Sequence, residues 1–193
     1  MKITRPKSPS PIPKHAKKVF SGIIFDVYQW KQKLYDGSFT TFEKLKRPDT
    51  VNVIPIDKSK RIIICKQSQP GRKPFYGFFG GRIDKGESPL HAAKRELLEE
   101  TGYKSENYLL LHSTQLTDKI DWACFTFIAK DCKKVSEPHL DAGEKIKLIF
   151  VSFDELLDFM YRNDFRDREI ESYIFKKLRD PKKLKKLKNL LFS

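Results

Sequence analysis

The sequence predicts an α+β fold, an α/β/α sandwich in which a mixed β-sheet lies between helices. The chain has 193 residues, a length typical of one globular domain. Segments rich in β-branched and aromatic residues outnumber those with helical spacing of apolar residues, and this mixture favours helices packed on a sheet. The 12% of aromatic residues exclude a wholly disordered chain. No apolar run reaches the ~18 residues that span a bilayer, so no membrane partner is expected.

The positive charge is concentrated at the two ends of the chain. The formal net charge is +14; residues 1–18 carry six positive charges and no negative one, and residues 176–193 carry eight against Asp180 alone. Such ends can bind nucleic acid, or they are solvated tails. The second interpretation is favoured because no aromatic residues alternate with these lysines to stack on bases. The predicted division is a basic flexible arm at 1–18, an antiparallel hairpin subdomain at 19–48, a main domain at 49–178 and a basic C-terminal helix or tail at 179–193.

The first half of the chain is predicted to consist mainly of strands. Asp36-Gly37 supplies the positive φ angles of a tight two-residue hairpin turn. A loop rich in Pro and Gly, at 69–74, interrupts the strand pattern further on. The predicted extended segments are Val19–Tyr35, Ser38–Leu45, Thr50–Ile56, Arg61–Gln67 and Phe75–Gly81.

The second half alternates helices with strands. A helix begins after Ser88, whose hydroxyl can cap the free amides, has Pro89 in its first turn and ends at Gly102. The predicted strands are Tyr108–His112, Trp122–Ala129 and Ile146–Phe153, and the later predicted helices are Ser152–Arg162, Arg166–Leu178 and a final one within Lys176–Leu191. The final helix would dock its leucines and expose its lysines.

Three carboxylates lie on one face of the helix that follows Ser88. Glu96, Glu99 and Glu100 are three and four residues apart, while the opposite stripe of Leu90, Ala93 and Leu97 is apolar. Carboxylates crowded together repel one another, and a divalent cation relieves that repulsion. Mg²⁺ prefers oxygen ligands together with water and substrate phosphates. Taken alone, three glutamates at this spacing favour a solvated acidic face.

The stretch GRIDKGESPLHAAKRELLEETGY, residues 81–103, resembles the Nudix box, G-x5-E-x7-R-E-U-x-E-E-x-G-U, where U is a bulky apolar residue. The residues that match the pattern are Gly81, Glu87, Arg95, Glu96, Leu97, Glu99, Glu100, Gly102 and Tyr103. The resemblance implies a Nudix fold, with 49–178 as the hydrolase domain. It also implies that Mg²⁺, or Mn²⁺ in its place, is held by Glu96, Glu99, Glu100 and the carbonyl of Gly80.

The same resemblance assigns roles to the rest of the box. Arg95 would orient the glutamates by ion pairing, and Glu87 would tie the loop to the helix. Gly81 and Gly102 would let the chain turn tightly around the helix. The reaction implied is the attack of an activated water on a diphosphate linkage, which releases a nucleoside monophosphate.

The general base stays open between residues inside and outside the box. Glu99 or Glu100 can take the proton of the attacking water. The order of elements resembles the ADP-ribose pyrophosphatase branch of the family, in which a glutamate on a later loop does so. Glu144 is the best match in this sequence, and Asp141 competes with it.

The ADP-ribose pyrophosphatase likeness also implies an N-terminal antiparallel extension that helps form a homodimer. Arg47 and Arg72 can bind phosphates or stack on a base, and Phe25 or Trp30 can sandwich an adenine. The first expected substrate is ADP-ribose or a related nucleotide sugar. The branch usually reads Glu-x-Pro-Ala-Gly into the box, whereas residues 77–81 here read GFFGG.

That departure keeps other substrates open. They are a dinucleoside polyphosphate, a modified nucleoside triphosphate and an RNA 5′ end, and a Nudix-fold module that binds nucleotide or nucleic acid without cleaving it is the non-enzymatic alternative. Cys65, Cys124 and Cys132 cannot all pair, and two of them lie in strand-like runs. Free buried thiols indicate a reducing, cytoplasmic location.

Overall fold

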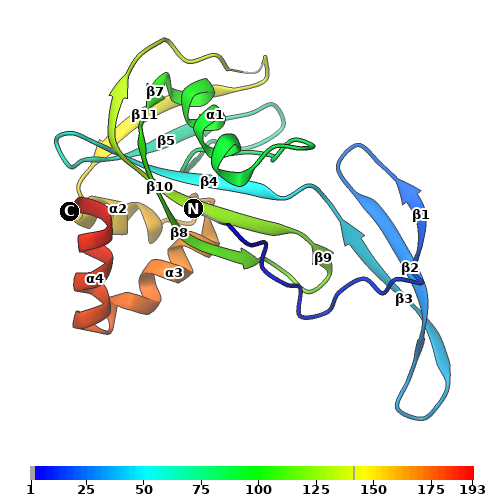
Figure 1. The fold of residues 1–193 in the computed structure, drawn as a ribbon. Helices are drawn as coiled ribbons and strands as arrows, with labels where there is room; N and C mark the ends of the chain where they lie inside the picture. Colours follow the sequence, from blue (N-terminus) through cyan, green and yellow to red (C-terminus); the bar gives the residue numbers. More distant parts are fainter. Residues whose placement is uncertain (1–2, 141) are drawn as a thin grey trace.

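The computed structural model describes residues 3–140 and 142–193. Eleven strands and four helices follow one another along this part of the chain (Figure 1). The strands are β1 (Lys17–Ser21), β2 (Asp26–Lys33), β3 (Phe39–Lys46), β4 (Thr50–Asp57), β5 (Ile62–Ser68), β6 (Phe75–Gly77), β7 (Tyr103–Lys104), β8 (Asn107–Gln115), β9 (Ile120–Asp121), β10 (Ala123–Lys134) and β11 (Lys145–Val151). The helices are α1 (Pro89–Thr101), α2 (Phe153–Met160), α3 (Arg168–Leu178) and α4 (Pro181–Phe192).

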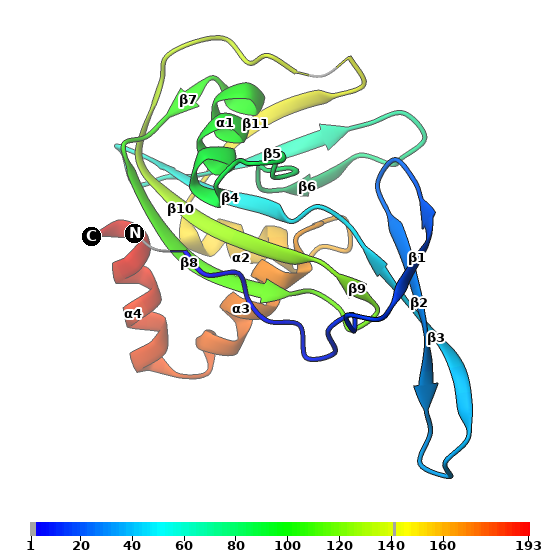
Figure 2. The ribbon, with the colours of Figure 1, turned by 45° about the vertical axis from the view of Figure 1, so that its right-hand side comes forward.

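A mixed sheet forms the centre of the molecule. Its strands run in the order β11-β5-β4-β10-β7, with β6 paired to β5 and β8 paired to β10. β4 and β10 are parallel, with Val53 opposite Phe127, whereas β5 and β11 are antiparallel. Figures 1 and 2 show α1 on one side of this sheet and α2, α3 and α4 on the other. This layering confirms the predicted α/β/α fold class.

The alternation of side chains along the central strands produces two cores. In β4, Val51 and Val53 face α1, while Ile54 and Ile56 face α2, α3 and α4. Ala92, Ala93 and Leu97 complete the core under α1, and the leucines of α4 complete the other one. Burying the apolar stripe of α1 against the sheet leaves its glutamates on the opposite side, where they face a cavity.

The N-terminal strands form a second, smaller sheet in the order β1-β2-β3-β9. The predicted single strand at Val19–Tyr35 is wrong, because the chain reverses between β1 and β2, where the Gly22 amide donates to the Phe25 carbonyl at 2.9 Å. The connection between β2 and β3 is also longer than the predicted two-residue turn. Gly37 takes a positive φ of 88°, whereas the Asp36 carboxylate caps the amide of Ser38.

Two separate helices form the C-terminal part of the chain, as predicted. The first is α3, which ends at Leu178, and the final helix within Lys176–Leu191 is α4, which begins at Pro181 and extends to Phe192. Proline lacks the amide hydrogen that a continuous helix requires, and Asp180 caps the new one by accepting from the amides of Lys182 and Lys183. Leu187 and Leu191 are buried against the core.

Candidate active site

The helix α1, which carries the three box glutamates, is fixed at both of its ends. The Ser88 hydroxyl accepts from the His91 amide at 3.2 Å, which fixes the first turn. At the other end Gly102 adopts a left-handed φ of 71°, and its amide donates to the Leu98 carbonyl. A side chain at Gly102 would lie 2.1 Å from the Ser136 carbonyl oxygen, so only glycine fits this position.

Glu100 is the most buried of the three glutamates. Only 9% of the residue is exposed, and its Oε2 atom accepts from the Gly80 amide at 2.8 Å. Burial raises the pKa of Glu100 to about 8; the Gly80 amide opposes this change, and the charges of Glu96 and Glu144 add to it. Glu100 is therefore a carboxyl group that needs a positive partner in order to ionise at neutral pH.

The backbone at Gly80 passes directly beneath this carboxylate. Its φ is 149°, and a Cβ atom there would lie 2.1 Å from the Val51 carbonyl oxygen. The carbonyls of Phe79 and Gly81 accept from the Val53 and Val51 amides, whereas no residue of the described ranges 3–140 and 142–193 donates to the Gly80 carbonyl. Gly80 lines the cavity, so this carbonyl is a candidate ligand.

Arg95 connects the box residues. Its guanidinium donates to both carboxylate oxygens of Glu87, at 3.1 and 3.0 Å. It also contacts Glu96 at 2.8 Å and Glu99 at 3.0 Å. The Arg95 bond holds the pKa of Glu87 down at about 2, while burial raises the pKa of Glu96. A single cation thus ties the loop before α1 to the acidic face of the helix.

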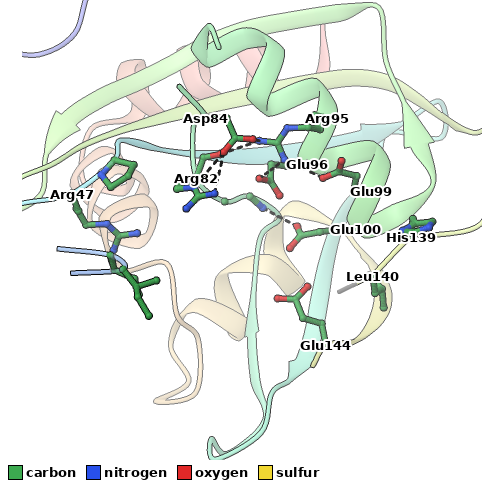
Figure 3. Close-up of a pocket in the computed structure, with 15 residues that line it drawn as sticks. Arg47, Arg82, Asp84, Arg95, Glu96, Glu99, Glu100, His139, Leu140 and Glu144 are labelled. Carbon is green, nitrogen blue, oxygen red and sulfur yellow. Dashed lines mark hydrogen bonds and ion pairs between the residues drawn. The ribbon is translucent and has the colours of Figure 1, made fainter. Parts of the chain in front are cut away.

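Glu144 faces the box glutamates from the other side of the cavity (Figure 3). It lies just before β11, and its Oε1 atom accepts from the amides of Gln67 at 3.1 Å and Gln69 at 3.0 Å. These two bonds hold the carboxylate toward Glu100, whose pKa it raises. Asp141, the competing candidate, lies outside the described residues.

All these groups surround one cavity of about 420 Å³. Glu96, Glu99 and Glu100 line one side and Glu144 faces them; Arg82 lies beside Asp84 and Glu96, and Arg47 lies farther along the cavity (Figure 3). Within residues 3–140 and 142–193, no three His, Cys, Asp or Glu side chains converge closely enough to hold a metal ion. Arg95 occupies oxygens of Glu96 and Glu99 instead. The set of donors, carboxylate oxygens and one free carbonyl, is nevertheless the set that a hard divalent cation prefers.

A second cavity of about 470 Å³ adjoins the first and shares Arg47, Gly80, Gly81 and Arg82 with it. Arg47 lies over the ring of Trp122 at 4.4 Å, and its buried Nε atom has no hydrogen-bond partner among the described residues. Arg72 also lines this second cavity. The two arginines singled out from the sequence are therefore brought to the same place.

The two predicted aromatic residues lie elsewhere. The centroid of the Phe25 ring lies 5.7 Å from the guanidinium carbon of Arg47, but Phe25 lines neither cavity. Trp30 packs on Phe42 in the small sheet, with ring centroids 6.0 Å apart, and its indole donates to Gln32. The structure does not bring Trp30 to the cavities within this chain.

Several residues of the site escaped sequence reasoning. Trp122 supplies the aromatic surface for Arg47, and His139 joins the cavity wall because its amide donates to the Glu99 carbonyl at 2.7 Å. Asp167 is fully buried beside the second cavity and accepts from the Phe78 amide at 2.6 Å. An acid directly before a helix suggests a capping residue, but the Asp167 side chain makes no capping bond, and no pattern in the sequence pairs it with Phe78.

The comparisons with known proteins agree with this site. A family model of the NUDIX domain matches residues 46–174. The chain is 27% identical to the ADP-ribose pyrophosphatase of Bacillus subtilis over 154 residues, 78% of this chain and 83% of that protein. It is 31% identical to the methanol dehydrogenase activator of Bacillus methanolicus over 147 residues, 75% of this chain and 80% of that protein.

A solved structure has the same fold. The crystal structure of an ADP compounds hydrolase superposes with a TM-score of 0.69 at 21% identity, covering 85% of this chain and 90% of that one. The matched family model includes the whole box, its glutamates and Glu144. The chain therefore belongs to the Nudix hydrolase family, resembles its ADP-ribose pyrophosphatase branch, and is a hydrolase of the pyrophosphatase type.

Proposed function

We propose that this protein is a Mg²⁺-dependent hydrolase that cleaves the diphosphate linkage of a nucleoside diphosphate derivative. The observation that carries the proposal is one cavity that brings Glu96, Glu99, Glu100 and Glu144 together with Arg47 and Arg82. A diphosphate bridge needs both kinds of side chain, because its own oxygens are anionic and the cation that neutralises them must be held by carboxylates.

The residues present fit a divalent cation, which Nudix hydrolases generally use. Glu96, Glu99, Glu100 and the free Gly80 carbonyl would hold Mg²⁺, or Mn²⁺ in its place. When bound, the cation neutralises phosphate charge and lowers the pKa of the attacking water. Glu100 would be ionised in the cation-bound protein, because a neighbouring positive charge opposes the burial that raises its pKa to about 8.

Other residues of the chain position the glutamates and accept the proton of the attacking water. Arg95 holds Glu96 and Glu99 in position, and Glu87 fixes Arg95. Glu144 accepts the proton of the attacking water. The position of Glu144 supports this role. It faces Glu100 across the cavity, Gln67 and Gln69 fix its Oε1 atom, and its Oε2 atom has no hydrogen bond within residues 3–140 and 142–193.

The two adjoining cavities suit a substrate with one group on each side of its phosphates. Arg47 and Arg82 border both cavities and would contact the diphosphate, and Arg72 lies in the second one. The stacked pair of Arg47 and Trp122 offers a flat surface to a nucleobase. The Phe25 ring centroid lies 5.7 Å from the guanidinium carbon of Arg47.

ADP-ribose or a related nucleotide sugar is the first proposed substrate, with AMP or another nucleoside monophosphate and a sugar phosphate as products. The relation to the Bacillus subtilis ADP-ribose pyrophosphatase over most of both chains supports this choice. A dinucleoside polyphosphate, a modified nucleoside triphosphate and an RNA 5′ end are the alternatives that the assay must separate.

A homodimer formed through the small N-terminal sheet is part of the proposal. Large apolar side chains are exposed there, among them Phe20 at 59%, Ile23 at 99% and Phe39 at 65%. Ile23 and Ile24 also border the catalytic cavity, so a partner seated on this sheet would cover the mouth of the site. Figure 2 shows the sheet projecting away from the central domain.

The proposed location is the cytoplasm. Cys65, Cys124 and Cys132 are free and buried, which suits a reducing compartment. No helix in the described part of the chain is both long enough and apolar enough to cross a membrane.

The test is a hydrolysis screen with product identification. Wild-type protein, Glu100→Gln and the exposed control Glu106→Gln are incubated with Mg²⁺ and ADP-ribose, a nucleotide sugar, a dinucleoside polyphosphate, an oxidised nucleoside triphosphate or a triphosphorylated RNA. We expect AMP and ribose 5-phosphate from ADP-ribose with the wild type and the control. Glu100→Gln should lose at least about a hundredfold in kcat. Equal turnover by wild type and Glu100→Gln on every substrate would refute the proposal.

A further inference from the structure

Two hollows lined by lysine lie on the side of the molecule away from the small N-terminal sheet. The first, between α4 and the end of β10, is lined by Lys130, Lys182, Lys185, Lys186, Asn189, Leu190 and Ser193. The second, between β10, β7 and the β4–β5 turn, is lined by Lys58, Lys104, Ser105, Glu106, Asn107, Lys130, Asp131 and Lys133. Lys130 borders both hollows, so they adjoin, and we call them together the lysine track.

Figures 1 and 2 show α4, the β4–β5 turn and the end of β10 at the left edge, opposite β1, β2 and β3. None of the residues of the lysine track lines either cavity of the active site. The track is thus a separate feature, and the proposed hydrolytic activity does not account for it.

The positive charge of the track is largely uncompensated. The lining contains seven lysines and two acids, Glu106 and Asp131. Lys104 pairs with Glu106 at 2.7 Å, and Lys130 donates to the Ser193 carbonyl at 2.8 Å. Within the described ranges, the amines of five lysines have neither an ion pair nor a hydrogen bond. These five are Lys58, Lys133, Lys182, Lys185 and Lys186. Like charges gathered in a hollow repel one another, and an anionic ligand relieves that repulsion.

The helix α4 places several of these lysines on one face. Lys182, Lys185, Lys186 and Asn189 have the i, i+3, i+4, i+7 spacing of one helix face, and α4 buries Leu187 and Leu191 on its other face. The leucines are therefore used by the core and are not available to enter a lipid bilayer. The side chains that line the track include no aromatic residue and only one apolar residue, Leu190.

We propose that the lysine track binds single-stranded nucleic acid through its phosphate backbone, without sequence preference. A flexible strand can follow two adjoining hollows, whereas a duplex is stiff over such a length. The side-chain amides of Asn107 and Asn189 can reach sugar hydroxyls beside the lysines. The lack of aromatic residues removes base stacking, so the binding energy comes from counterion release.

The experiment measures fluorescence anisotropy of a labelled RNA of about 12 nucleotides, a length within the usual range for such sites. The test variant changes four exposed lysines of the track to glutamine, at positions 133, 182, 185 and 186. The matched control removes the same charge from exposed lysines elsewhere, at positions 14, 17, 31 and 33. All three proteins keep the catalytic residues, so their hydrolysis of a small substrate reports correct folding.

We expect the track variant to bind at least about tenfold more weakly at low salt and its log K against log salt slope to shrink by about 3, since each lost phosphate contact removes about 0.7. The control variant should keep most of the affinity, and RNAs of different sequence should bind alike. The proposal is overturned if the track variant binds like the wild type or the control loses as much. It is also overturned if inorganic polyphosphate of equal phosphate content binds more tightly than RNA, or if only anionic vesicles bind.

Discussion

Arg95 and Glu87 are joined by two parallel hydrogen bonds, and the same guanidinium reaches Glu96 and Glu99. The bidentate contact leaves the arginine one orientation, so the position of the acidic face of α1 depends on a residue of the preceding loop. Changes at Glu87 and changes at the glutamates of α1 should therefore affect stability and activity to different degrees.

Replacing Glu87 by glutamine should lower stability in a pH-dependent way. Because Arg95 brings the pKa of Glu87 from 4.5 down to about 2, its contribution is present above about pH 4.5 and is lost as pH falls toward 2. Glu87→Gln should cost about 1–2 kcal/mol at pH 7, and the gap to wild type should close in acid. Urea unfolding at several pH values measures this. A gap of constant size from pH 7 to pH 2 would contradict the assignment. Asp158→Asn, at an exposed acid of α2 that has no ion pair within residues 3–140 and 142–193, is the control.

Cation binding should become tighter as pH rises toward 8. The folded-state pKa of Glu100 is raised from 4.5 to about 8, so the cation-free protein holds a proton there that binding must displace. The same proton makes the cation-free protein lose stability as pH rises from about 4.5 to about 8. Calorimetry of Mg²⁺ binding in two buffers of different ionisation enthalpy should show up to one proton released below pH 7. Glu100→Gln should abolish that release, and an unchanged release in this variant would place the proton elsewhere.

Changing Glu144 to glutamine should separate proton transfer from cation binding. Glu144 is held by Gln67 and Gln69 rather than by Arg95. We expect kcat to fall by about 10²–10⁴-fold while Mg²⁺ affinity changes little. Glu137→Gln, an exposed glutamate of the preceding loop that pairs with Lys134, is the matched control and should retain full activity. Full activity of Glu144→Gln would move the base to Glu99 or Glu100.

Alanine at Gly80 should be far more damaging than alanine at Gly37. Both glycines have positive φ, but a Cβ at Gly80 would lie 2.1 Å from the Val51 carbonyl oxygen, whereas one at Gly37 meets no atom within 4 Å. We expect a cost of at least about 3 kcal/mol for Gly80→Ala and about 1 kcal/mol for Gly37→Ala. Thermal unfolding of both variants compares them directly. Equal costs would mean that the backbone at Gly80 moves freely away from Val51.

The proposed dimer should dissociate when charge is placed on the small sheet. Light scattering should give wild-type protein a mass twice the 22.7 kDa of one chain. Ile23→Glu combined with Phe20→Glu should give the mass of one chain, because a buried unpaired carboxylate opposes association. Val135→Glu is the control, since Val135 is half exposed outside this sheet. A wild-type protein that is already monomeric would refute the dimer.

The box was predictable because one helix positions most of its parts. The spacing of Glu96, Glu99 and Glu100 fixes their common face, and Ser88 and Gly102 mark the ends of the helix. These relations are local, so helical geometry suffices to derive them. The mixed sheet was predicted from local segments with a strand-like side-chain pattern. The observed strands begin and end a few residues away from the predicted positions.

The parts that escaped prediction depend on contacts between distant segments. Trp122 reaches Arg47, and Asp167 reaches the Phe78 amide, only after the sheet and the helices have packed. The reversal between β1 and β2 was missed for another reason. It interrupts a segment whose side-chain pattern continues across the interruption, so periodicity alone joins the two strands.

The parallel pairing of β4 with β10 has a consequence for how the protein is made. Val53 lies beside Phe127, so the middle of the sheet needs two segments that are synthesised far apart in time. Until β10 has been synthesised, the apolar side chains of β4 and of α1 lack the strand against which both of them pack. Productive folding must therefore be largely delayed until translation has passed β10, and the emerging polypeptide is the form most exposed to misassembly and to chaperones.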